Sequence, residues 1–359
     1  MIESPHAASR NAAGRRGCRV SALADEARPG PPGSREQAAR VGLRVVQAGP
    51  VLILAVVALA MTVLSPFFLT ERNLTNLGFQ TSIVAVLALG QLLVILTRGI
   101  DLSVGSVVAL SGVLGVMAGD SGVLVVACMA LTGALVGAVN GLVLVKGRIM
   151  NPFIVTLGTL SIVRGVALVV SDAQTVSGLP PLVQTLGTDK AGPIPVPALL
   201  VAVLAVLAWV LLARTQWGRW IYAVGGDPDA ARRVGIPVGR LLLSVYVLCG
   251  LAAGIAGLLV AGRTDAGSPT AGQLLELDAI TAVIIGGASF FGGRGSVANV
   301  IAGALIIGVI RNGLNLLDVT PFWQSIAVGA LVILSLELDV LRGQLEQRLR
   351  VAGARSAEA

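Results

Sequence analysis

Few residues in this sequence could carry out acid–base, nucleophilic or metal chemistry. The single histidine, His6, lies in a polar N-terminal stretch, and the three cysteines, Cys18, Cys128 and Cys249, are more than a hundred residues apart. This spacing fits neither a zinc site nor a disulfide framework. We therefore expect no catalytic residue, no metal and no cofactor in this chain.

The lysines argue against an ATPase site. A phosphate-binding P-loop needs Gly-Lys-Ser or Gly-Lys-Thr after a glycine-rich turn, whereas the two lysines, Lys146 and Lys190, follow Val145 and Asp189. The chain is thus not expected to be an ATP-hydrolysing enzyme.

Polar residues at the ends of apolar segments or within them are the remaining candidates for function. In a membrane such a side chain either binds a substrate or bonds to another helix. The candidate pathway residues are Asp101, Ser103, Asn140, Asn312 and Asn315, with Gln91 and Ser111 as further polar positions. For Asp101 a second interpretation is open, because an acid at a helix start can serve as its N-cap.

Two arginines, Arg164 and Arg311, also fall inside apolar segments. A charge at membrane depth is costly, so it faces a polar interior or extends to an interface. Both interpretations remain open, since each arginine lies toward the outer end of its segment.

The elements that must position these residues are transmembrane helices. Of the 359 residues 55% are hydrophobic and only 13% charged, about half the charge of a typical soluble domain, which excludes most water-soluble folds. Segments of about 20 apolar residues span a bilayer as helices. The predicted spans are 45–64, 78–97, 102–118, 123–145, 153–170, 197–213, 241–261, 278–291, 297–316 and 322–338. We predict an all-α polytopic membrane protein with about ten transmembrane helices.

The net charge of +7 indicates orientation. If residues 1–44 are cytoplasmic and the spans alternate, the inside segments hold 21 Lys and Arg residues and the outside loops hold three. This asymmetry follows the positive-inside rule and places both termini in the cytoplasm and the protein in the cell membrane. Nucleic-acid binding is not expected, because no basic patch is interleaved with aromatic residues.

Three regions follow from this topology. Residues 1–44 are rich in arginine, proline and glycine and are predicted to be a disordered cytoplasmic tail. Residues 45–340 form the transmembrane domain, and residues 341–359 form a cytoplasmic C-terminal tail.

Two spans have unusual sequences. The third begins with an acid and two hydroxyls, in Asp101–Ser106, and the eighth is short and is followed by Gly286-Gly287 and Gly292-Gly293. Broken segments are tolerated at membrane depth where they are buried in protein or line a cavity. Glycines also repeat every four residues, at Gly133, Gly137 and Gly141 and at Gly250 and Gly254, which predicts close helix packing.

The longest internal cytoplasmic segment, 214–240, carries the signals of a short helix. Asp227 can cap it, Pro228 suits its first position, and Gly235 ends it. Asp229 and the pair Arg232-Arg233 match the helix dipole. We predict a surface helix of about two turns from Asp227 to Val234, with turns on both sides, that serves for docking.

The sequence shares several motifs, in the same order, with a known family of membrane proteins. The sequence resembles the permease subunits of ribose and related monosaccharide ATP-binding-cassette importers, in the superfamily that also holds branched-chain amino-acid permeases, over about residues 45–340. The matching stretches are 97–106 (TRGIDLSVGS), 151–159 (NPFIVTLGT) with Arg164-Gly165, 225–235 (GGDPDAARRVG), 269–272 (PTAG), 276–280 (ELDAI), 292–296 (GGRGS) and 312–316 (NGLNL).

The resemblance implies a homodimeric permease in the bilayer, an ATPase bound at its cytoplasmic face, and an extracytoplasmic sugar-binding protein. It implies that the helix at 227–234 is the coupling helix that docks on the ATPase. The coupling residues carried over are Gly225, Gly226, Asp227, Asp229, Ala231, Arg232 and Gly235. The chain departs from its relatives at Asp227-Pro228, where Asn-Glu is frequent, which leaves the docking residues themselves open.

Other functions remain possible from the sequence. A branched-chain amino-acid permease belongs to the same superfamily. An ion-coupled secondary transporter would be expected to pair ionisable residues deep in the bundle, whereas Asp101 and Asp278 lie near predicted span ends. A membrane-embedded enzyme would need a cluster of His, Cys or acidic residues at one depth, which the sequence does not suggest.

Overall fold

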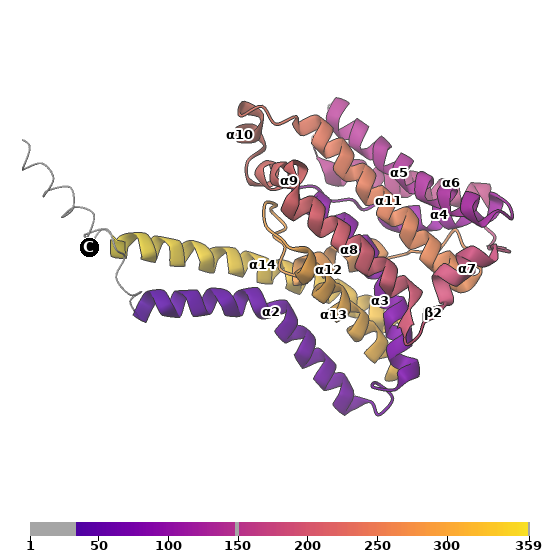
Figure 1. The fold of residues 1–359 in the computed structure, drawn as a ribbon, viewed down its shortest axis with the longest axis horizontal. Helices are drawn as coiled ribbons and strands as arrows, with labels where there is room; N and C mark the ends of the chain where they lie inside the picture. The colour runs from indigo at the N-terminus through magenta and orange to yellow at the C-terminus, as the bar shows by residue number, and fades with distance from the viewer. Residues whose placement is uncertain (1–33, 148–150, 358–359) are drawn as a thin grey trace, which may run out of the picture. The chain divides into compact units, whose positions relative to one another are not determined.

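The computed structural model describes residues 34–147 and 151–357, and residues Gln47–Glu346 form one compact unit. Within it, helices follow one another with short connections (Figure 1). The helices in the first half are α2 (Ser34–Leu64), α3 (Glu71–Leu96), α4 (Val104–Met117), α5 (Gly122–Lys146), α6 (Pro152–Val170) and α7 (Pro181–Thr188). Those in the second half are α8 (Val196–Arg214), α9 (Gln216–Gly226), α10 (Pro228–Arg233), α11 (Val238–Thr264), α12 (Leu275–Ile285), α13 (Val297–Leu316) and α14 (Pro321–Ala357).

Four two-residue strands form two antiparallel pairs, both small. The strands are β1 (Val176–Ser177), β2 (Lys190–Ala191), β3 (Ile194–Pro195) and β4 (Ala266–Gly267). β1 pairs with β4, with Val176 opposite Gly267, and β2 pairs with β3 in a hairpin whose Gly192 has a φ of +65°. These pairs fasten loops to the helical bundle, so the expected all-α fold is confirmed.

Among the described residues six helices are long and apolar enough to cross a membrane: α3, α5, α6, α8, α11 and α13. The other four expected spans correspond to shorter apolar stretches, Gly49–Leu64, α4, α12 and Pro321–Glu337. The 14 residues of α4 and the 11 of α12 reach about 21 Å and 17 Å, less than the roughly 30 Å of the hydrocarbon layer. The chain is thus a polytopic membrane protein in which α4 and α12 are too short to cross the hydrocarbon layer alone.

The eighth expected span, 278–291, is wrong in its bounds. The helix begins at Leu275 and ends at Ile285, because Gly287, Gly292 and Gly293 adopt φ values of +84°, +85° and +73°. Left-handed backbone ends a helix and is cheap only for glycine. The segment after Ile285 is therefore a loop.

The N-terminal tail predicted at residues 1–44 is described only from residue 34 onward. Helix α2 begins at Ser34, and residues 1–33 lie outside the described residues. Residues 34–44 include three arginines, two alanines, one glutamate and one glutamine, residue types that favour helix, and the helix extends before the apolar span.

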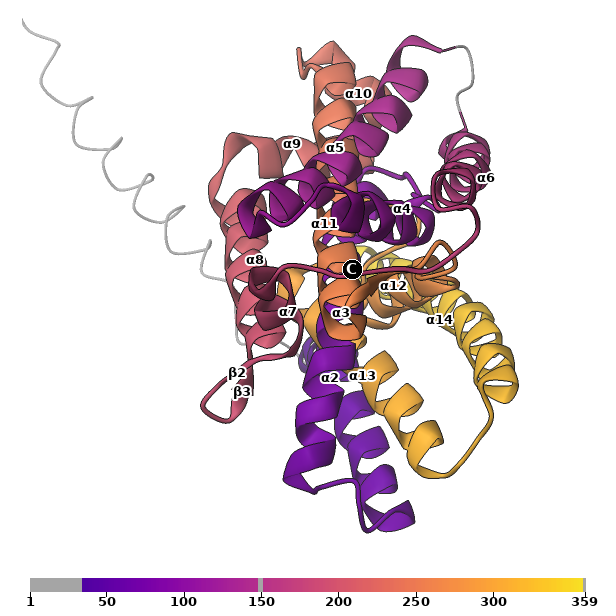
Figure 2. The same cartoon turned by 90° about the vertical axis from the view of Figure 1, so that its right-hand side faces the viewer.

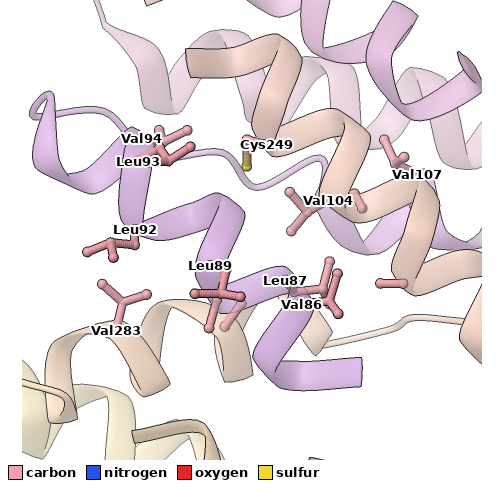
Figure 3. Close-up of a cluster of buried hydrophobic side chains, with 14 of the residues drawn as sticks. Val86, Leu87, Leu89, Leu92, Leu93, Val94, Val104, Val107, Cys249 and Val283 are labelled. Carbon is pink, nitrogen blue, oxygen red and sulfur yellow. The ribbon is translucent and has the colours of Figure 1, made fainter. Parts of the chain in front are cut away.

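Helix α3 is the centre of the core. All thirteen residues from Val84 to Leu96 are buried, and the helix contacts α8, α11, α12 and α13. Figure 3 shows Leu87, Leu92 and Val94 of this helix among side chains of neighbouring elements, including Cys249 and Val283. A helix that is apolar on every face suits a position surrounded by others.

The glycine repeats lie in one interface, as the close-packing prediction requires. Helices α5 and α11 run against each other in both views (Figures 1 and 2). A Cβ added at Gly250 would press on the carbonyl oxygen of Gly133 and lie 2.9 Å from the nitrogen of Gly137. The two backbones approach too closely for any side chain at these positions, which is how small residues drive helix association in lipid.

Candidate functional site

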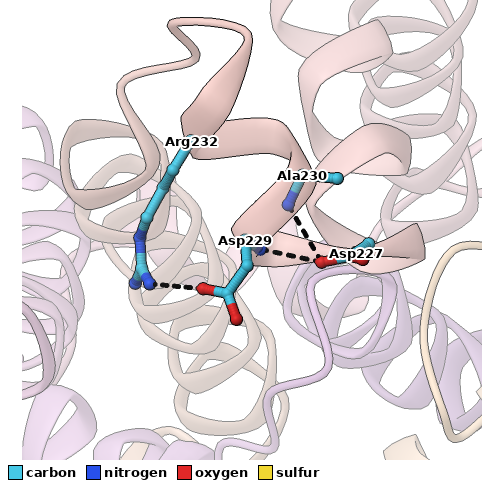
Figure 4. Close-up of polar contacts among 4 residues, drawn as sticks. All are labelled: Asp227, Asp229, Ala230 and Arg232. Atoms are coloured by element: carbon cyan, nitrogen blue, oxygen red, sulfur yellow. Dashed lines mark hydrogen bonds and ion pairs between the residues drawn. The ribbon is translucent and has the colours of Figure 1, made fainter.

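The predicted coupling helix is present as α10, a six-residue helix whose first turn is capped by Asp227. The Oδ1 atom of Asp227 accepts hydrogen bonds from the backbone amides of Asp229 (2.9 Å) and Ala230 (3.0 Å), as Figure 4 shows. Arg232 forms an exposed ion pair with Asp229 at 3.0 Å. Gly235, with a φ of +82°, ends the helix. The capping signals in the sequence therefore predicted this local structure correctly.

The hydrogen bonds donated by these two backbone amides stabilise the charged form of the Asp227 carboxylate. They lower the pKa of Asp227 below its ordinary 3.8, with smaller contributions from Arg98 and Arg233. Of the helix residues, Ala231 is buried against the bundle whereas Val234, just after the helix, is 77% exposed. One face of α10 is thus anchored and the other is free for a partner.

A turn was predicted before α10, but the structure has a helix there. Helix α9 (Gln216–Gly226) fills most of this segment and runs directly into the Asp227 cap. Its start is capped by Thr215, whose hydroxyl accepts from the amide of Gly218 at 3.1 Å. Ile221 and Val224 are buried on one face. This helix was not predicted, although Ile221 and Val224 lie on one apolar face at helical spacing.

An arginine connects the α9–α10 corner to the break between α3 and α4. The Nε atom of Arg98 donates to the carbonyl of Gly225 at 2.8 Å, and its Nη2 donates to the carbonyl of Gly226. Arg98 itself has a φ of +64°, a left-handed conformation that turns the chain sharply after Leu96. We call Arg98, Gly225, Gly226 and Gly293 the junction.

The loop that follows α12 completes the junction. The amide of Gly293 donates to the carbonyl of Leu96 at 3.0 Å, and Tyr222 on α9 donates to the carbonyl of Gly295 at 2.9 Å. A Cβ at Gly225 would lie 2.9 Å from the Cα of Gly293. Three segments far apart in sequence therefore meet by backbone contact at the base of α10.

Three of the candidate pathway residues form one buried cluster. The Oδ1 atom of Asp101 accepts from the Ser103 amide (2.9 Å) and from the Ser103 hydroxyl (2.6 Å). Asn140 on α5 donates to the Ser103 hydroxyl at 2.9 Å and lies 3.4 Å from Asp101 Oδ1. All three side chains are no more than 1% exposed. Asp101 thus lies away from solvent, three residues before the start of α4 at Val104, and its carboxylate organises the turn that begins the helix.

Neighbouring side chains satisfy the backbone of the same break. The carbonyl of Ile100 accepts from Thr156 (3.2 Å) and Tyr246 (3.4 Å). With its side-chain amide turned so that the nitrogen faces the Asp101 carbonyl, Gln91 can pair with both backbone groups of Asp101, at 3.1 and 3.2 Å. Irregular backbone at membrane depth requires such partners, so Gln91 has a structural role here. Ser111, the other polar position, bonds within its own helix to Val108 at 3.1 Å.

The remaining two pathway candidates bond elsewhere. Asn312 exchanges two hydrogen bonds with Asn73, at 2.9 and 2.8 Å, and Asn315 accepts from Gln324 at 2.7 Å. These contacts join α13 to α3 and α14. The structure does not bring Asn312 and Asn315 into contact with the Asp101 cluster.

The two arginines inside apolar segments both have partners. Arg164 donates to the carbonyls of Pro269 (2.8 Å) and Ala271 (2.7 Å). Arg311 forms an ion pair at 2.7 Å with Asp278, whose side chain is fully buried. Neither arginine side chain therefore needs to extend to a membrane interface to stabilise its charge. The sequence analysis did not predict this ion pair, whose partners lie 33 residues apart.

Sequence reasoning missed Arg98 and Tyr222 as site residues. In the sequence, Arg98 is one of several positive charges on the predicted cytoplasmic side, and Tyr222 is one residue of the 214–240 loop. No spacing rule links residue 98 to residues 225 and 226, since their hydrogen bonds join positions more than 120 residues apart. Only the tertiary contact identifies them.

The class of protein follows from this helical bundle and from comparison with known proteins. Residues 73–336 match the family described as the branched-chain amino acid transport system / permease component. The chain belongs to this family and is a multi-pass permease of the cell membrane.

Curated relatives match over most of both chains. The ribose import permease protein of Bacillus subtilis (strain 168) is 41% identical over 81% of this chain and 92% of its own length. The D-allose transport system permease protein of Escherichia coli (strain K12) is 41% identical, with coverage of 82% and 91%. The fructose import permease protein of Rhizobium meliloti is 40% identical, with coverage of 80% and 83%. No solved structure matches the chain.

Proposed function

We propose that this chain is the transmembrane permease subunit of an ATP-binding-cassette importer for a monosaccharide, of the ribose or xylose type. The relatives named above and a galactose/methyl galactoside import permease that is 35% identical all carry monosaccharide names. A family description that mentions branched-chain amino acids makes an amino-acid permease the second candidate.

The single observation that carries the coupling role is the junction. An exposed helix, α10, is tied through Gly225 and Gly226 to Arg98, which lies in the break between two membrane helices. Movement of α10 by an ATPase would therefore act on the α3–α4 break directly. In this proposal Gly225, Gly226 and Gly235 shape the ends of the coupling helix, while Asp227, Asp229, Ala231 and Arg232 hold it folded and anchored.

The pathway role of the buried cluster follows from the same connection. Asp101, Ser103 and Asn140 lie between the α3–α4 break and α5. We propose that they respond to α10 through the backbone from Arg98 to Asp101, and that the cavity opens alternately to the two sides. Asn312 and Asn315 are assigned to helix pairing, because each already has an amide partner.

The proposed topology has ten apolar segments in the membrane, of which α4 and α12 are short, with both termini in the cytoplasm. It places residues 45–340 in the permease domain, residues 341–359 in the cytoplasm, and α10 beside an ATPase that supplies the hydrolysis. A second copy of the permease and an extracytoplasmic sugar-binding protein complete the proposed importer.

Reconstitution tests this proposal. The full chain is placed in proteoliposomes with the ATPase and binding protein of its own cell, and uptake of labelled ribose, xylose and leucine is measured with and without internal ATP. We expect ATP-dependent uptake of a pentose, and we expect it to be lost when residues 227–235 are replaced by a Gly/Ser linker of equal length.

Three results would contradict parts of the proposal. Uptake of leucine alone would assign the chain to the amino-acid branch. Uptake driven by an ion gradient without ATP would make it a secondary transporter. Persistence of ATP-coupled uptake in the linker variant would remove the coupling role from α10.

A further inference from the structure

A lateral groove lies between the end of α8, helix α9 and the first half of α11. It has a volume of about 490 Å³, within the range of roughly 300–1,000 Å³ typical of ligand pockets. Its lining is mostly apolar: Leu211, Trp217, Ile221, Arg240, Leu243, Ser244, Val245, Val247 and Leu248. None of these residues belongs to the junction or to the Asp101 cluster.

One end of the groove has the character of a membrane interface. Three of the four tryptophans of the chain, Trp209, Trp217 and Trp220, fall within twelve residues of each other. Trp217 and Trp220 pack edge to face at 5.5 Å, and Arg214 lies 5.4 Å from the ring of Trp209. Tryptophan and arginine gather where membrane helices leave the hydrocarbon layer, so this end lies at headgroup level.

The other end of the groove lies deeper in the hydrocarbon. The lining residues on α11 run from Arg240 to Leu248, eight residues apart, which is about 12 Å along a helix. The deeper residues are aliphatic, and the one hydroxyl, that of Ser244, donates to its own helix at Leu241 (2.8 Å). This part of the groove offers no free polar partner and suits a hydrocarbon chain.

Arg240 is the only charged group that lines the groove. Its side chain is exposed, and within the part of the chain that the structure describes no carboxylate is paired with it. An unpaired guanidinium at headgroup level attracts anionic lipid, through charge and through bidentate hydrogen bonds to phosphate oxygens. A neutral hydrophobic ligand would give the Arg240 guanidinium no anionic partner.

We propose that this groove binds one anionic phospholipid per chain, with its phosphate on Arg240 and an acyl chain along Leu243, Val247 and Leu248. The lipid fills the space between α8 and α11 beside the helix α9 that leads to α10. The binding site is separate from the sugar pathway, and its existence does not depend on the proposed transport function.

Native mass spectrometry of the full chain in detergent tests the proposal, with equal amounts of phosphatidylglycerol and phosphatidylethanolamine added. We expect one phosphatidylglycerol to be retained in preference to phosphatidylethanolamine. Arg240→Gln should reduce this preference about fivefold, the effect of one interfacial arginine. The matched control is Arg72→Gln, since Arg72 is also exposed but lies on α3 outside the groove. Leu248→Trp, which fills the deeper end, should reduce binding of both lipids.

Several results would overturn the proposal. Equal retention of both lipids by the wild type, or equal losses in Arg240→Gln and Arg72→Gln, would show that no specific site exists. Displacement of the lipid by inorganic phosphate alone would make Arg240 a simple anion site. A change in oligomeric state in Leu248→Trp, with lipid binding unchanged, would assign the groove to contact between copies of the chain. Size-exclusion profiles of each variant exclude misfolding as the cause.

Discussion

Removing the arginine of the junction, by Arg98→Ala, should separate ATP hydrolysis from transport. Arg98 donates to the carbonyls of Gly225 and Gly226, which end α9 just before α10, the proposed coupling helix. Hydrogen bonds from a charged donor contribute about 1.5–3 kcal/mol each, and exposure of Arg98 to water reduces this value. A loss of about 1–3 kcal/mol of coupling remains, equivalent to about 5–150-fold.

The assay is sugar uptake per ATP hydrolysed in proteoliposomes that contain the complete importer. Arg98→Ala should lower uptake by about 5–150-fold, the factor expected for the lost coupling, while ATPase activity falls much less. Arg98→Lys should restore only part of the coupling, because a single ammonium does not present the two fixed donors of a guanidinium. Arg219→Ala is the matched control, since Arg219 is an exposed arginine on α9 that is outside the junction.

The result that would refute the reasoning is uptake per ATP in Arg98→Ala equal to that of the wild type. Equal losses in Arg98→Ala and Arg219→Ala would also refute it, because positive charge in this region, and not the junction geometry, would then control coupling. The melting temperature of each variant shows whether the fold is intact.

Three further predictions concern packing, charge and pH. Gly250→Ala should destabilise the protein by about 1–3 kcal/mol through overpacking against α5, whereas Gly158→Ala, with open space around its Cβ, should not; thermal unfolding in detergent compares them. Asp278→Leu or Arg311→Leu alone should cost about 3–5 kcal/mol by leaving a buried charge unpaired, and the double variant should be more stable than either; a larger loss in the double variant would contradict this. The pKa of Asp227 is lowered in the folded helix. Protection of the α10 amides from hydrogen exchange should therefore be present above pH 3.8 and be lost as the pH falls through the lowered pKa of Asp227. Asp227→Asn should remove this pH dependence.

Local features were largely predictable because their causes lie within a few residues. The cap at Asp227, the proline at the first helical position and the stop at Gly235 act over one or two turns, and α10 has these bounds. The glycine repeats predicted close packing in the same way. Helix α9 was not predicted, because it is stabilised by burial of Ile221 and Val224 against the bundle and not by strong local signals.

The lengths of α4 and α12 could not be read from hydropathy. Both lie in apolar sequence, and a hydropathy window does not distinguish a helix that crosses the bilayer from one that stops at membrane depth. What ends them is backbone geometry: a left-handed Arg98 and the Asp101 turn before α4, and left-handed glycines after α12. At the α3–α4 break, Tyr246 of α11 donates to the exposed carbonyl of Ile100, a contact that no local pattern in the sequence specifies.

By itself, the sequence determined that this is an all-α membrane protein, and where the short capped helix α10 lies. These properties depend on composition and on interactions between near neighbours along the chain. Only the tertiary structure decided that Asp101, Ser103 and Asn140 meet, that Asn312 and Asn315 pair elsewhere, and that Arg98 holds the base of α10. The physical reason is that hydrogen bonds between residues distant in sequence form only where helix packing brings donor and acceptor together, and no local pattern encodes that packing.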